Sequence, residues 1–171
     1  MAWATGSSLN PVLQPSFCGE RRGKRFFLNA AASPGTQVAH CEIPAGMPIV
    51  MTPGVGFAWA PTDGQTDQEL LEAAEFFASG VSDPRVVLDG SRVPTGDAYV
   101  SDVIDVTLHP GNFIQTVDPA TEGLDVTQIA FIGYFVKIAL SEGSHTLIIR
   151  DTIELPDGPA NFRYRFEIEA T

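Results

Sequence analysis

The stretch FIGYFVKIALSEGSHTLIIRDTIELPDGPANFRYRFEIEA, residues 131–170, decides the fold class. It divides into three apolar segments, Phe131–Leu140, Ser144–Glu154 and Asn161–Ala170, which are separated by Ser-Glu-Gly and Pro-Asp-Gly-Pro turns. Segments of this kind, rich in β-branched and aromatic residues and bounded by turn formers, are typical of strands. The sequence therefore predicts three successive antiparallel strands in an all-β domain.

The composition agrees with a single β-rich domain. A chain of 171 residues can bury roughly 70% of the surface that its unfolded form exposes. The hydrophobic content of 44% and the charged content of 18% exclude a disordered chain, and 16 Gly with 13 Pro indicate many turns. We predict an irregular lead-in over residues 1–24, followed over residues 25–171 by one antiparallel β-sandwich domain, jelly-roll-like or Ig-like.

One short helix is expected near residues 67–79. Thr66 and Glu69 have the spacing of a capping box, in which the two side chains accept hydrogen bonds from backbone amides of the first helical turn. Gly80 stands just beyond the expected end of the helix. Apolar residues recur at the spacing of one helical face, which comprises Leu70, Ala73, Ala74 and Phe77.

Two hairpins are expected from their turn residues. Ser33-Pro34-Gly35 predicts a turn between Arg25–Ala32 and Thr36–Ile43, because Pro presets φ and Gly takes the left-handed position. Asp89-Gly90 suits a two-residue hairpin loop in which both residues need positive φ.

The remaining segments are expected to be shorter strands and loops. The Pro53–Gly56 stretch should separate a strand at Met47–Met51 from another at Phe57–Ala60. Tyr99–Leu108 alternates in the manner of one half-buried strand. The long connection His109–Gln128 is either a functional loop or a crossover between sheets.

The charge distribution argues against nucleic acid as a partner. A net charge of -11 and a pI near 4.5 oppose phosphate binding, which needs clustered basic residues. One basic cluster does occur, since four of the ten Lys and Arg residues are Arg21, Arg22, Lys24 and Arg25. This cluster is either an anion contact or a solvated loop.

The two cysteines, Cys18 and Cys41, flank the basic cluster and are expected to form a single disulfide. Such a bridge would stabilise the fold by about 3 kcal/mol and would imply an oxidising compartment. No apolar run is long enough to span a membrane. The first residues lack the features of a signal peptide and look like a mature terminus with an initiator Met. We therefore expect a secreted or periplasmic protein.

The order of several short motifs resembles that of a group of uncharacterised exported bacterial β-sandwich proteins. The motifs are Asn10-Pro11-Val12, Cys41-Glu42-Ile43-Pro44-Ala45-Gly46, Leu88-Asp89-Gly90, Gly133-Tyr134-Phe135-Val136, Gly143-Ser144-His145-Thr146-Leu147 and Phe162-Arg163-Tyr164-Arg165-Phe166. The resemblance spans most of the chain. It implies export and a sandwich fold, and it implies no catalytic activity.

Three residues are candidates for a catalytic site. His109 precedes Pro110 at the end of a predicted strand, a position typical of both site rims and plain loops. His145 follows a turn, where it could instead bind a backbone carbonyl. Asp102 shares strand parity with apolar residues, so it is either buried, with a shifted pKa, or near the strand end in solvent.

Neither a metal nor a cofactor is expected. The three histidines do not have the close spacing of a preformed metal pair. Asp63, Asp67 and Glu69 superficially resemble a calcium loop, but the EF-hand spacing is absent and helix capping accounts for Asp67 and Glu69.

Aromatic residues near loops and segment ends are candidates for ligand binding. They are Phe57, Trp59, Tyr99 and Phe113. Rings in such places can stack on sugar faces, and they can equally pack in a core.

These observations predict a noncatalytic exported binding or structural module whose ligand is a glycan or a protein surface. One alternative is a jelly-roll enzyme with a His and Asp site in a sheet concavity. Another is a subunit of a surface or extracellular assembly, including a homo-oligomer.

Overall fold

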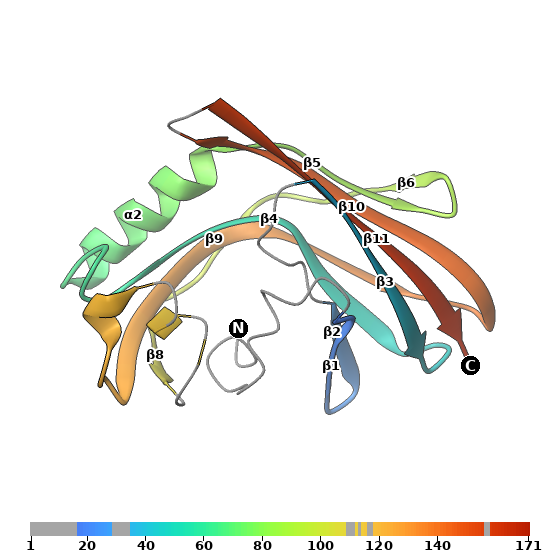
Figure 1. Ribbon diagram of the computed structural model, residues 1–171, viewed down its shortest axis with the longest axis horizontal. Helices are drawn as coiled ribbons and strands as arrows, with labels where there is room; N and C mark the ends of the chain where they lie inside the picture. Colours follow the sequence, from blue (N-terminus) through green and yellow to red (C-terminus); the bar gives the residue numbers. More distant parts are fainter. Residues whose placement is uncertain (1–16, 29–34, 109–111, 113, 116–117, 156–157) are drawn as a thin grey trace.

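The computed structural model describes most of the chain, in residues 17–28, 35–108, 112, 114–115, 118–155 and 158–171. Within these ranges the chain is mostly strand, in two sheets with one α-helix, α2 (Asp67–Ser79) (Figure 1). The prediction of an all-β fold with one short helix is therefore confirmed. His109 and Phe113 lie outside the described residues.

In the described ranges one sheet has six strands and is ordered β1-β2-β4-β9-β7, with β8 also paired to β9. Its strands are β1 (Gly19–Arg22), β2 (Arg25–Leu28), β4 (Pro48–Trp59), β7 (Tyr99–Val100), β8 (Ile104–Thr107) and β9 (Val126–Ala139). The other sheet has five strands, ordered β3-β11-β10-β5-β6. These are β3 (Gly35–Ile43), β5 (Val81–Leu88), β6 (Ser91–Val93), β10 (Gly143–Leu155) and β11 (Gly158–Ala170).

The prediction of a purely antiparallel arrangement is wrong, because both sheets are mixed. β3 pairs in parallel with β11, and β2 pairs in parallel with β4. The expected hairpin between Arg25–Ala32 and Thr36–Ile43 is therefore absent, since β2 and β3 belong to different sheets. The proposed turn residues Ser33 and Pro34 lie outside the described residues.

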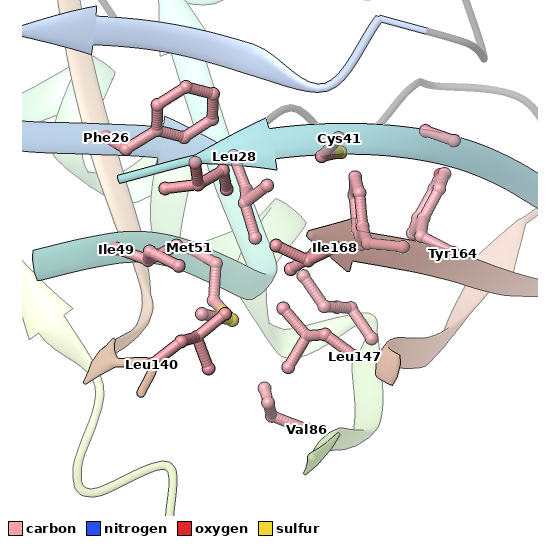
Figure 2. Close-up of a cluster of buried hydrophobic side chains, with 14 of the residues drawn as sticks. Phe26, Leu28, Cys41, Ile49, Met51, Val86, Leu140, Leu147, Tyr164 and Ile168 are labelled. Carbon is pink, nitrogen blue, oxygen red and sulfur yellow. The ribbon is translucent and has the colours of Figure 1, made fainter. Parts of the chain in front are cut away.

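The two sheets contribute side chains to a shared hydrophobic cluster. Figure 2 shows Phe26, Ile49 and Met51 of the six-stranded sheet near Leu147 and Ile168 of the five-stranded sheet. The last two strands alternate as expected, so that one face of each is buried in this cluster. The cluster positions the two sheets against each other at one end of β4 and β9.

The other end of the long strands β4 and β9 packs against α2, on the same side as the five-stranded sheet (Figure 1). Contact is very close, because a Cβ at Gly56 would lie 2.1 Å from the backbone nitrogen of Ala78. Small residues are needed here, and Ala58, Ala74 and Ala130 supply them. One side of the curved six-stranded sheet is thus covered along both of its halves.

Helix α2 begins as predicted. The Thr66 hydroxyl accepts a hydrogen bond from the Glu69 backbone, and the Glu69 carboxylate accepts one from the Thr66 backbone. The predicted apolar face of α2 is only partly confirmed. Leu70 and Ala74 are buried, whereas Phe77 is 43% exposed, because the close approach of the helix leaves room for alanine and not for a ring at this end.

Strand β4 is continuous where a break was expected. The Pro53–Gly56 stretch forms a bulge, seen as a register shift against β9 between Met51 and Gly54. Such a bulge inserts an extra residue without ending the strand. The extra residue exchanges the two faces, so that Met51 and Gly56 both lie on the covered side despite their opposite parity.

Of three further local predictions, one is confirmed and two are wrong. The Asp89-Gly90 hairpin joins β5 to β6, with φ of 48° and 81° at its two turn residues, as predicted. The single strand expected at Tyr99–Leu108 is interrupted and forms β7 and β8. A further strand, β1, lies in the segment that was expected to be irregular.

Candidate functional site

Five aromatic rings lie on one face of the six-stranded sheet, and we call this surface the aromatic face. Phe57 and Trp59 come from β4, Phe131 and Phe135 from β9, and Tyr99 from β7. Phe57 lies directly opposite Phe131 in the β4–β9 ladder. Residues two apart in a strand share a face, so the rings of each strand project to the same side.

The rings contact one another across the strands. The ring centroid of Tyr99 lies 6.1 Å from that of Phe131 and 5.9 Å from that of Phe135, and these two lie 5.8 Å apart. On β4 the centroids of Phe57 and Trp59 are 5.2 Å apart. These separations are in the favourable range for aromatic pairs. The rings therefore form a group of three over β7 and β9 and a pair on β4, and the two groups are neighbours because Phe57 is opposite Phe131.

Part of this surface is open to solvent. Tyr99 is 56% exposed and Phe135 is 39% exposed, while Phe57, Trp59 and Phe131 are half-buried. The face lies opposite the side that α2 covers, because Gly56 and Ala58 alternate with Phe57 and Trp59 along β4. An exposed group of aromatic side chains is typical of a binding surface.

The indole of Trp59 is held in place at the rim of the aromatic face. Its Nε1 donates a 2.6 Å hydrogen bond to a carboxylate oxygen of Asp118. The same carboxylate accepts hydrogen bonds from the Thr62 hydroxyl and from the backbone nitrogen of Ala120, at 3.0 Å in the second case. The hydrogen bonds from Thr62 and Trp59 lower the pKa of Asp118, so the carboxylate stays ionised. The Trp59 ring is thereby pre-oriented.

The edge strand that carries Tyr99 is also fixed. The Ser101 hydroxyl accepts a 2.8 Å hydrogen bond from the backbone nitrogen of Phe131, and the Ser101 backbone nitrogen donates to the Phe131 carbonyl at 2.9 Å. These bonds continue the ladder past the end of β7. The position of Tyr99 beside β9 is therefore defined by the backbone.

Three of the four predicted ligand-binding residues, Phe57, Trp59 and Tyr99, come together on this face. Phe131 and Phe135 were not among the predicted ligand-binding residues, although both lie in the stretch that decides the fold class. The sequence does contain a signal for these two residues: Phe131, Gly133 and Phe135 are spaced two apart, so the two phenylalanines lie on the same face of a strand. Sequence alone did not show which parity faces the core.

The predicted catalytic residues that the structure describes are not brought together. Asp102 is exposed, between β7 and β8 of the six-stranded sheet. His145 lies in the five-stranded sheet, where its Nδ1 is 2.7 Å from a carboxylate oxygen of Asp89 and its Nε2 is 3.1 Å from the Ser141 carbonyl. The Asp89 carboxylate raises the pKa of His145. His145 thus joins the β5–β6 hairpin to the start of β10.

A separate open depression of about 500 Å³ lies over β3, β10 and β11. Its lining is mostly polar, with three acidic residues, and includes His40, Glu42, Ser144, His145, Glu167 and Glu169. Within the described residues, no group of three His, Cys, Asp or Glu side chains is placed to hold a metal ion.

Cys18 and Cys41 are joined in a disulfide, in agreement with the pairing expected from the sequence. The bond connects the base of the β1–β2 hairpin to β3, and so links the two sheets. Among the described residues, no helix has the length and apolar character needed to cross a membrane.

The geometry of the aromatic face is the main basis for a functional assignment, since comparison of the chain with known protein families, with curated proteins and with solved structures finds no match.

Proposed function

We propose that the protein is an exported, noncatalytic binding module that holds a glycan on its aromatic face. The observation that supports this most directly is the convergence of five rings from three strands on one face, with Tyr99 and Phe135 accessible. The rings belong to strands of a β-rich domain, which we infer to be a sandwich because both sheets contribute to one core.

Stacking on sugar rings suits the chemistry of this surface. One face of a pyranose carries C–H groups that pack against an aromatic ring and lose water as they do so. Rings on strands are held more rigidly than rings on loops, and Trp59 is further fixed by Asp118. Pre-orientation reduces the entropy lost on binding. A row of rings suits an extended chain of sugars better than a single small molecule.

The disulfide supports the proposed export. Disulfides persist in oxidising compartments and are rare in the reducing cytosol. The Cys18–Cys41 bond links the two sheets and is not placed as a reactive pair beside the aromatic face. The suggested relationship to exported bacterial β-sandwich proteins has the same implication, and it too stays a proposal.

A His and Asp catalytic site receives no support from the described residues. Both ring nitrogens of His145 have partners, Asp89 in the β5–β6 hairpin and Ser141 in the β9–β10 turn. Asp102 lies between two strands of the other sheet. The binding of a protein surface, or of a second copy of this chain, would use the same apolar rings and is distinguished by experiment.

The test is retention of the purified protein on a panel of neutral polysaccharides, with isothermal titration calorimetry for any that bind. The Tyr99→Ala/Phe135→Ala variant should lose binding by at least about tenfold, because each ring buries apolar area. The Phe76→Ala/Phe77→Ala variant is the matched control. It removes two exposed rings, 73% and 43% exposed, from helix α2 and should bind as the wild type does.

Equal loss in both variants would contradict a role for the aromatic face. Failure of the wild type to bind any neutral glycan, together with concentration-dependent dimerisation that Tyr99→Ala/Phe135→Ala abolishes, would replace the glycan with a second copy of the chain. Analytical ultracentrifugation measures that dimerisation directly.

A further inference from the structure

Three arginines from neighbouring strands lie side by side on the five-stranded sheet. Arg150 of β10 is directly opposite Arg163 of β11 on one side and Arg85 of β5 on the other. We call these three residues the arginine row. Neighbouring strands are about 4.8 Å apart, so the row places three positive charges along a line that crosses the strands.

The arginine row faces outward from the core. Arg150 and Arg163 are exposed, while the residues that alternate with them, Ile149 and Phe162, are buried. Thr36 of β3 extends the same row by one strand, opposite Arg163. In the described part of the chain, the pattern of exposure along β11 shows that no helix or strand covers this face.

The acidic side chains do not neutralise the centre of the row. Arg85 is paired with Asp83, at one end. Among the described residues, neither Arg150 nor Arg163 has an ion pair or a hydrogen bond from its side chain. Like charges directly opposite each other destabilise a sheet, so this arrangement has an energetic cost in the free protein.

This clustering of arginines, with its energetic cost, is unexpected because the chain has few basic residues. The chain has ten Lys and Arg residues and 21 acidic residues. Four of the ten basic residues lie in the Arg21–Arg25 segment, and another four are the three residues of the arginine row and Arg165. Arg165 lies on the same face, two residues along β11 from Arg163, and is paired with Glu167. Although the net charge of the chain is -11, this face of the five-stranded sheet therefore carries a local cluster of positive charge.

We propose that the arginine row binds a linear acidic polysaccharide whose carboxylates repeat along the chain. A guanidinium donates two parallel hydrogen bonds to a carboxylate, which makes arginine well suited to this group. The next row of the same face carries neutral polar side chains, Ser82, Thr152 and Asn161, which are aligned across the strands. These side chains suit the hydroxyl groups of sugars. Bound carboxylates would also remove the repulsion between the arginines.

The surroundings favour a narrow, sparsely charged chain over a nucleic acid. Glu167 and Glu169 lie on the same face, four and six residues from Arg163 along β11, and four residues of strand span about 13 Å. A duplex with one charge per about 1.7 Å is wide enough to meet these carboxylates. A single sugar chain laid along the arginine row avoids them.

This site is separate from the aromatic face, because the two lie on different sheets. It does not depend on the proposed binding of a neutral glycan. The two proposals can therefore fail independently.

The probe is polygalacturonate, which carries one carboxylate on each sugar, titrated by calorimetry at low salt and at about 0.15 M salt. The wild type should bind it with an affinity that falls as salt rises. Arg150→Gln/Arg163→Gln should weaken binding by about tenfold or more, as expected for the loss of charge-assisted hydrogen bonds. Lys24→Gln/Arg25→Gln removes the same charge from the β1–β2 hairpin and should leave the affinity within about twofold of the wild type, as a matched control.

A second variant separates binding from folding. Arg150→Glu places a carboxylate between Arg85 and Arg163, so it should raise the melting temperature while it abolishes binding. Tyr99→Ala/Phe135→Ala should bind polygalacturonate normally. A stable Arg150→Glu protein that does not bind would support the proposal.

Three results would overturn it. The first is no binding of polygalacturonate by the wild type, and the second is equal loss in the Lys24→Gln/Arg25→Gln control. The third is binding of a DNA duplex at least as tight as that of polygalacturonate, with the same loss in Arg150→Gln/Arg163→Gln, which would assign the row to nucleic acid.

Discussion

Gly133 of β9 lies directly opposite Tyr99 of β7, in the gap between Phe131 and Phe135. Because position 133 has no side chain, the Tyr99 ring lies beside two phenylalanine rings at once. On its other side Gly133 is opposite Val55 of β4. The absence of a Cβ at this one position thus helps three strands to approach and to present their rings together.

Substitution of Gly133 by Ala should therefore destabilise the protein. A Cβ there would lie 2.8 Å from the Gly54 carbonyl oxygen and 2.9 Å from the Val55 Cβ, and backbone cannot move away as a flexible side chain could. We expect the free energy of unfolding to fall by about 1–3 kcal/mol, measured by urea denaturation. Gly80→Ala is the control, because its Cβ meets its nearest neighbour at an ordinary 3.5 Å and φ is -75°. If Gly133→Ala is no less stable than Gly80→Ala, the close approach of β4 and β9 is not as described.

Asp151 should make the stability of the protein depend on pH. Burial on the inner side of β10 raises the pKa of Asp151 to about 6, from 3.8. The folded protein holds this proton more tightly than the unfolded chain, so the contribution of Asp151 to stability is fully present below pH 3.8 and is lost as pH rises through about 6. Asp151→Asn removes this loss and should stabilise the protein by about 1–2 kcal/mol at pH 8, since water still reaches part of the group.

The comparison that checks this is urea denaturation of Asp151→Asn and the wild type at pH 4 and pH 8. A gain at pH 8 with little or none at pH 4 is expected. A gain of the same size at both pH values would show that packing, and not ionisation, is responsible. Burial, together with the nearby charge of Asp151, raises the pKa of Tyr164. Tyr164 therefore does not titrate between pH 4 and pH 8.

The His145–Asp89 pair should act in a different pH range. The Asp89 carboxylate raises the pKa of His145 above 6.5, and hydrogen bonds from His145 and from the Thr146 backbone lower the pKa of Asp89 below 3.8. The contribution of His145 is fully present below pH 6.5 and is lost as pH rises through its folded pKa, while that of Asp89 is lost as pH falls below 3.8.

His145→Gln should therefore cost about 0.5–1 kcal/mol at pH 5.5 and less at pH 8, a magnitude suited to a partly exposed pair. Direct titration of His145 by NMR gives an independent value for its pKa. A pKa at or below 6.5 would contradict the pairing seen here.

The disulfide should contribute to stability through the unfolded state. Cys18 and Cys41 are 23 residues apart, and closing a loop of this size removes chain entropy equivalent to about 3 kcal/mol. Cys18→Ser/Cys41→Ser should lower the free energy of unfolding by about 2–4 kcal/mol. Intact mass after alkylation, with and without reductant, checks that the bond exists. Two alkylated thiols in the unreduced protein would rule it out.

Much of the local structure could be predicted from the sequence. The capping box at Thr66 and Glu69 marked the start of α2, and Asp89-Gly90 marked a hairpin, because each depends on atoms only a few residues apart. The two strands that follow Gly143 were also predicted, since turn residues bound them and alternation runs along their length. The bulge in β4 was not, because a Pro and Gly run favours a chain break unless tertiary packing continues the strand.

Taken by itself, the sequence determined that the chain is β-rich, where its tight turns lie, where its helix begins and which cysteines can join, because these follow from short-range chemistry. Only the tertiary structure decided that β3 pairs in parallel with β11, more than a hundred residues later, and that Arg85, Arg150 and Arg163 share one row. It also decided which parity of β9 faces the core, and hence that Phe131 and Phe135 join Tyr99. Pairing between distant strands depends on how two sheets and a helix bury their apolar faces together, and no local pattern contains that information.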